Sequence, residues 1–90
     1  MPYINSDDRK RLDPNLDYLG IECPQTAGEL NYLFTKISLD YLNAWQDTQS
    51  KYQNYNDVIG ALEACKLEFY RRAVAPYEDK KIEENGDVYE

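Results

Sequence analysis

Histidine is absent from the chain, and the four glycines form no glycine-rich phosphate loop. Without histidine, neither the commonest zinc sites nor a histidine-based nucleophilic triad can be assembled. No serine or cysteine stands beside a recognisable base in the sequence. A pair of carboxylates can always be chosen from seventeen acids, so their number does not indicate acid–base catalysis. We therefore predict that the protein is not an enzyme and needs no metal or cofactor.

Cysteine is scarce: the chain has two, Cys23 and Cys65, and their spacing is not that of a metal site. Two free thiols in a reducing compartment are the simplest interpretation, and a disulfide between them stays open. Cys65 lies on the apolar face of an expected helix, which favours a small core residue.

Residues 1–8 lack the basic and apolar regions of a signal peptide. No apolar run approaches the roughly 20 residues of a membrane span. These features predict a cytoplasmic protein with no membrane partner.

Positive charge is in the minority, with ten lysines and arginines against seventeen acids and a net charge of −7. Binding to duplex nucleic acid depends on neutralising phosphates, so we expect no duplex partner. A small anionic ligand needs only a local cationic pocket, and net charge affects its arrival more than its fit.

The 42% of hydrophobic residues, which include nine tyrosines, make the chain too apolar to be disordered. Ninety residues form one domain at most. A chain of this size buries only about 60–65% of its unfolded surface, so its core is small and self-association would extend it.

Two stretches predict helices in the first half of the chain. Ser6 is the expected N-cap of a short helix, and Asp13-Pro14 is typical of a second start that runs to Gly20. Thr26 and Glu29 form a capping box ahead of a long helix at 27–47. Apolar residues recur in it at three- and four-residue steps: Leu30, Leu33, Phe34, Ile37, Tyr41, Ala44 and Trp45. Tyr32, Leu39 and Leu42 add a second strip, which is typical of a helix at the centre of a domain or at a subunit contact.

A second long helix is predicted at 57–75, after a polar loop at 46–56 whose edges could be helical. Asn56 is its expected cap, and the helix should end before Pro76 because proline cannot continue it. The following tail, 77–90, holds six acids against Lys80 and Lys81, and Asn85-Gly86 predicts a tight turn in it. We expect this turn to fold Ile82 and Val88-Tyr89 back onto the helices. The spacing of its acids is not that of a calcium-binding loop, so a solvated acidic tail is the interpretation.

The predicted fold class is therefore all-α. It comprises a small helical domain at 1–76, with two long amphipathic helices and a short N-terminal helix, and an acidic C-terminal tail at 77–90. Because the 27–47 helix carries more apolar surface than one partner helix can cover, we also predict a homo-oligomer.

One cluster of side chains could bind a ligand. Arg71 and Arg72 could hold a phosphate, Tyr70 and Tyr77 could stack on a base, and Lys80 could close the site from the tail. The structural alternative is that Arg72 pairs with Glu68 and that both arginines only complement the helix dipole.

The same region carries a family resemblance. The chain resembles a family of small uncharacterised proteins encoded by phages, prophages and bacteria, most specifically through Phe69-Tyr70-Arg71-Arg72, Pro76-Tyr77-Glu78-Asp79-Lys80-Lys81 and Asn85-Gly86-Asp87-Val88-Tyr89. Further matches are Met1-Pro2-Tyr3-Ile4, Leu12-Asp13-Pro14 and Gly28-Glu29-Leu30-Asn31-Tyr32. The resemblance implies no activity. It implies a phage-type accessory protein, acting in the cytoplasm of a bacterial host cell.

Two functions follow as expectations. The first is a non-enzymatic anti-defence sponge, which binds and sequesters a small anionic nucleotide signal through Tyr70, Arg71, Arg72, Tyr77 and Lys80. The alternative is an acidic inhibitor or adaptor that docks on a basic surface of a host protein. A purely structural or assembly role is also compatible with the residues.

Overall fold

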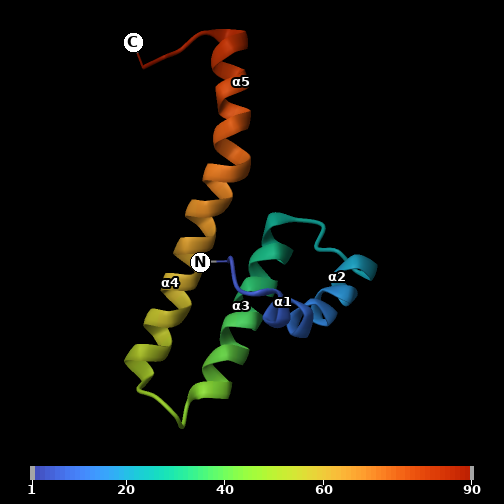
Figure 1. Cartoon of the computed structure of the whole chain (residues 1–90), viewed down its shortest axis with the longest axis vertical. Coiled ribbons are helices and arrows are strands. Elements are labelled where there is room, and N and C mark those ends of the chain that lie inside the picture. The colour runs from blue at the N-terminus through green and yellow to red at the C-terminus, as the bar shows by residue number, and fades with distance from the viewer. Residues whose placement is uncertain (1, 90) are drawn as a thin grey trace. The chain divides into compact units, whose positions relative to one another are not determined.

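A computed structural model of the chain describes residues 2–89, and every regular element among them is helical (Figure 1). This confirms the predicted all-α class, with two long helices and short helices near the N-terminus. The described residues form two compact units, residues 3–59 and residues 60–89 together with Pro2. No helix within residues 2–89 is both long enough and apolar enough to span a membrane.

The N-terminal helical turns run from Ser6 to Ile21. Helix α1 spans Ser6–Leu12, the 3₁₀ turn η1 spans Asp13–Leu16, and α2 spans Asp17–Ile21. The cap of α1 is Asn5, whose Oδ1 accepts from the Asp8 N–H at 2.9 Å, and not Ser6 as predicted. The Asp13-Pro14 pair is accommodated in the 3₁₀ turn, so the chain stays helical through the proline.

Helix α3 spans Ala27–Trp45, close to the predicted 27–47. Thr26 caps it as expected, because its Oγ1 accepts from the Glu29 N–H at 3.1 Å. The Glu29 carboxylate reaches back one residue further than in a standard capping box and accepts from the Gln25 N–H at 3.0 Å.

Helix α4 spans Lys51–Phe69, so the loop predicted at 46–56 is wrong over its second half. Ser50 is the residue that starts the helix: its Oγ accepts from the Gln53 N–H at 3.1 Å. Ser50 and Gln53 stand in the S-x-x-Q spacing of a capping box, a signal hidden by the polar composition around it. Asn56 is therefore inside the helix and does not cap it.

The prediction that the helix ends before Pro76 is also wrong. A π-helical turn, η2, spans Tyr70–Val74, and α5 continues over Ala75–Asn85. Proline lacks an N–H and its ring clashes with the carbonyl four residues back in an α-helix. In η2 the Ala75 N–H bonds to the Tyr70 carbonyl five residues back, which is the wider turn that lets the helix pass the proline.

Most of the predicted tail at 77–90 is consequently helix, and whether it acts as a domain of its own stays a prediction. The chain leaves α5 at Gly86, whose φ of 89° is in the region that favours glycine. Its N–H bonds to the Ile82 carbonyl at 2.8 Å. Beyond it, Val88 and Tyr89 are 88% and 95% exposed, so the turn at Gly86 does not bury these two side chains.

No apolar side chain described by the structure is buried, and Asn54, at 3% exposure, is the buried residue. The two cysteines are free and exposed, so Cys65 is not the core residue that its helix face predicted. Large apolar side chains are exposed both on the helices and in the segments at the two ends of the described chain.

Candidate functional site

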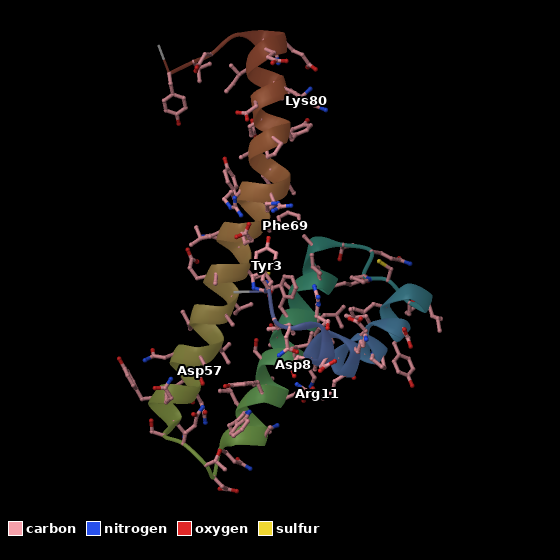
Figure 2. The ribbon with its side chains drawn as sticks, viewed as in Figure 1. Tyr3, Asp8, Arg11, Asp57, Phe69 and Lys80 are labelled. Atoms are coloured by element: carbon pink, nitrogen blue, oxygen red, sulfur yellow. The ribbon has the colours of Figure 1, made fainter. Side chains whose placement is uncertain are left out.

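The five predicted ligand residues lie around the π turn and on α5. Tyr70, Arg71 and Arg72 belong to η2, whereas Tyr77 and Lys80 belong to α5, on which Figure 2 labels Lys80. Tyr70 and Tyr77 are 55% and 58% exposed. Because Pro76 has no N–H, it donates to neither the Arg71 nor the Arg72 carbonyl.

Arg71 is held by its own helix. Its Nε and Nη2 donate to Glu68 Oε1 at 3.0 and 2.6 Å. The arginine that pairs with Glu68 is thus Arg71, not Arg72 as the structural alternative predicted. The Arg71 side chain keeps 66% of its surface in water and the Glu68 side chain 23%, so the pair joins an exposed arginine to a half-buried glutamate.

Tyr77 has a cation above its ring, but the cation is Lys81 and not one of the predicted residues. The Lys81 Nζ lies 5.4 Å from the Tyr77 ring centroid and 3.2 Å from Glu84 Oε2. These contacts hold the Lys81 ammonium on the side of α5 where Tyr77 and Glu84 lie.

The π turn explains why Tyr70 and Tyr77 do not share a face. In an unbroken α-helix, residues seven apart lie almost one above the other. One extra residue in the turn rotates everything after it by about 100°, which brings Glu78 rather than Tyr77 beneath Tyr70. Of the five predicted residues, Tyr70 alone lines the hollow on this side of α5.

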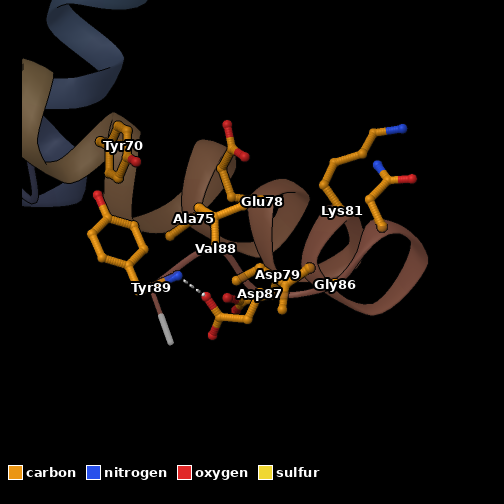
Figure 3. A pocket seen from close by; sticks show the side chains of 11 residues that line it. Tyr70, Ala75, Glu78, Asp79, Lys81, Gly86, Asp87, Val88 and Tyr89 are labelled. Carbon is orange, nitrogen blue, oxygen red and sulfur yellow. Dashed lines mark hydrogen bonds between the residues drawn. The ribbon is translucent and has the colours of Figure 1, made fainter.

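This hollow, which we call the α5 hollow, lies between α5 and the segment after it, residues 86–89 (Figure 3). Its volume is about 520 Å³. The residues around it are Tyr70, Ala75, Glu78, Asp79, Lys81, Ile82, Asn85, Gly86, Asp87, Val88 and Tyr89. Three carboxylates and one lysine give it a negative charge, which opposes an anionic ligand.

Residues 3–59 contain a polar junction that the sequence analysis missed. Asp57, labelled in Figure 2 on the first turns of α4, accepts three hydrogen bonds. The donors are the Tyr41 hydroxyl at 2.8 Å, Gln49 Nε2 at 2.9 Å and Gln53 Nε2 at 2.6 Å. Asn54 completes the junction, because its amide donates to the Trp45 carbonyl at 3.3 Å and its oxygen accepts from Gln49.

The junction changes the acidity of two groups. The hydrogen bond from Tyr41, followed by those from Gln49 and Gln53, lowers the pKa of Asp57 below its usual 3.8. The bond to Asp57 raises the pKa of Tyr41 above 10.0, with desolvation and the nearby negative charge acting in the same direction. All these donors stabilise the charged carboxylate, so the junction is a structural clamp between α3 and the start of α4. The signal for this junction in the sequence is the density of side-chain amides at 46–56, the range predicted above as a loop.

Beside the junction lies a smaller hollow of about 220 Å³, lined by Leu39, Leu42, Asn43, Gln46, Lys51, Asn54 and Tyr55. Its side-chain amides, the Lys51 ammonium and the Tyr55 hydroxyl offer hydrogen bonds to a ligand. Within residues 2–89 no three acid or cysteine side chains gather in a way that could hold a metal ion.

Comparison with known proteins gives a match to a protein family. The family model described as "Domain of unknown function (DUF6899)" matches residues 1–88. Neither the curated proteins nor the solved structures contain a significant match to the chain. The family match agrees with the resemblance to an uncharacterised family, and it adds no activity.

Proposed function

The chain belongs to the family described as a domain of unknown function (DUF6899), and from this premise we propose that it is a non-enzymatic interaction protein. It acts as a phage-type accessory protein that associates with itself and docks on a basic surface of a host protein. One observation carries the proposal: among the described residues every large apolar side chain keeps contact with water, and none forms a core. A protein partner would supply the burial that the single chain lacks.

The apolar stripe of α3, which consists of Leu30, Phe34, Ile37 and Tyr41, is the surface best suited to self-association. Its members are 42%, 45%, 62% and 38% exposed. Their spacing of four, three and four residues is typical of helices that pair with other helices. No charged residue of α3 lies in the stripe, and the carboxylate that Tyr41 contacts, Asp57, accepts two further hydrogen bonds from Gln49 and Gln53.

Sedimentation tests the self-association. We expect the wild-type chain to sediment above its 10.6 kDa monomer mass at tens of micromolar. Ile37→Glu places a charge on the stripe and should shift the chain to the monomer. Lys36→Glu, one residue away and off the stripe, is the matched control and should leave the assembly intact. A wild-type monomer at all concentrations would contradict the proposal.

The second contact, with a basic host surface, is supported by the acidic balance of the chain and of α5. An interface between exposed charges weakens as salt screens them. A host protein captured by the chain should therefore be released progressively as sodium chloride rises from 50 to about 500 mM. Capture that is indifferent to salt would argue against an acidic docking surface.

Nucleotide sequestration is a second candidate, because Tyr70, Arg71 and Arg72 share a π turn, a feature frequent at functional sites. Of the five residues, Tyr70 lines the α5 hollow and the other four do not, so we assign this anti-defence role to a homo-oligomer whose subunits complete each other's site. A thermal-shift panel of cyclic nucleotides and ADP-ribose variants tests it. A ligand at 100 times its dissociation constant stabilises by about 2.7 kcal/mol. Arg71→Ala with Arg72→Ala must abolish that shift, and the nucleotide must be recovered intact.

A further inference from the structure

We propose that the α5 hollow receives a basic side chain, arginine or lysine, from a partner protein. This inference rests on the proposed interaction function and names the surface and the chemistry that it recognises. The hollow lies within residues 60–89, where α5 forms one wall and residues 86–89 form the other (Figure 3).

The charge of the hollow selects a cation. Glu78, Asp79 and Asp87 line it, and its one lysine, Lys81, points its ammonium away from the two tyrosine rings in Figure 3. That ammonium is already placed beside Glu84 and over the Tyr77 ring, and neither of these residues lines the hollow. Among residues 2–89, no ion pair joins the three acids of the lining to a cation.

The uncharged part of the lining selects a cation on an aliphatic stem. The rings of Tyr70 and Tyr89 lie at one end, and Ile82 and Val88 add aliphatic surface. Lysine and arginine bury their methylene stems against apolar groups and present their charge to aromatic faces and carboxylates. A simple metal ion would use none of this apolar surface, whereas a basic side chain uses all of it.

The second wall is held in place by local bonds. The positive φ of Gly86 turns the chain out of α5, and the Tyr89 N–H then donates to Asp87 Oδ1 at 2.8 Å. This bond spans two residues and keeps the backbone of the segment bent. A volume of about 520 Å³ accommodates a basic side chain together with part of the backbone that carries it.

Fluorescence anisotropy with defined peptides tests the inference on the full chain. The probe is a fluorescein-labelled octapeptide of alternating arginine and leucine, and the comparison probe replaces each arginine with glutamate. We expect the arginine peptide alone to bind. Tyr89→Ala should weaken it about fivefold, the size of one cation–π contact, whereas Tyr89→Phe keeps the ring and should retain affinity.

Two carboxylate variants separate the site from net charge. Asp87→Asn in the hollow and Asp47→Asn in the exposed turn before α4 each remove one negative charge. Asp87→Asn should weaken the arginine peptide about fivefold and Asp47→Asn by less than about twofold. Far-UV circular dichroism checks that each variant stays helical.

Three results would overturn the inference: equal weakening by the two carboxylate variants, no effect of Tyr89→Ala, or no difference between the two peptides. The sedimentation experiment distinguishes this failure from that of the proposed function. If the chain self-associates and captures a host protein while the hollow variants bind like wild type, the function stands and the docking surface lies elsewhere.

Discussion

In residues 3–59 side chains far apart in sequence bond to one another, whereas in residues 60–89 the hydrogen bonds and ion pairs of the described side chains stay local. The Tyr41 hydroxyl reaches Asp57 sixteen residues away, and Asn54 reaches the Trp45 carbonyl nine residues away. In the second unit Lys66, Arg71 and Lys81 each pair with a glutamate three residues away. A single substitution can therefore break the junction of residues 3–59. In residues 60–89 each ion pair involves neighbours on one helix, so one substitution removes only a local contact.

Breaking the junction should have the largest effect. Asn54→Ala removes a buried amide and its two hydrogen bonds, the one from Gln49 and the one to the Trp45 carbonyl, at a cost of about 2 kcal/mol in the free energy of unfolding. Urea unfolding followed by circular dichroism measures this loss. Asn56→Ala, two residues further along the same helix and exposed, should change it by less than about 0.5 kcal/mol. Equal losses from the two variants would show that the junction does not hold the unit together.

A smaller and opposite effect is expected in the second unit. Pro76→Ala restores an N–H and removes the ring clash, so η2 can relax to α-helix and the local helix should gain about 1 kcal/mol. Hydrogen exchange of the amides in residues 70–80 measures the gain, and the amides of residues 3–59 should exchange as before. Pro24→Ala lies in the connector before α3, and it should not slow the hydrogen exchange of any helical amide. Unchanged exchange around Pro76→Ala would mean that the π turn does not depend on the proline.

The smallest effect is the response of the junction to pH, because water reaches both of its titrating groups. The lowered pKa of Asp57 contributes stability that is present above 3.8 and is lost as pH falls through the folded-state value. The raised pKa of Tyr41 contributes stability that is present below 10.0 and is lost as pH rises through its folded-state value. The melting temperature of wild type minus that of Tyr41→Phe should thus be greatest between these limits and decline on both sides. A difference that is constant from acid to alkaline pH would contradict the role of the hydroxyl–carboxylate bond.

Local signals explain which elements were predictable. The bond from the Glu29 N–H to Thr26 depends on residues three apart, and so does the start of α3. Ser50 and Gln53 carried the same kind of signal, but the polar run around them concealed it. The side-chain amides of Gln49 and Gln53 donate to Asp57, and that of Asn54 donates to the Trp45 carbonyl. These partners lie several residues away in the sequence, so composition alone does not reveal them.

The candidate site was predicted less well, because its geometry depends on one turn of backbone. Arg71, Arg72, Tyr70 and Tyr77 were grouped by closeness in sequence, and Pro76 was interpreted as the end of the helix. The π turn lets the helix continue and rotates Tyr77 away from Tyr70. Glu78 and Tyr89 therefore line the hollow beside Tyr70, and Tyr77 does not. Proline removes one α-helical hydrogen bond. Its presence does not decide whether the helix ends there or continues past it through a wider turn.

By itself, the sequence determined the all-α class, the capped start of α3 and the excess of apolar and acidic surface, because each depends on residue type and short-range spacing. The structure decided that α4 begins at Lys51 after the Ser50 cap, that the helix passes Pro76, and which side chains meet at Asp57 and in the α5 hollow. These features depend on where hydrogen-bond donors find acceptors in space, and a single shifted turn changes every face that follows it.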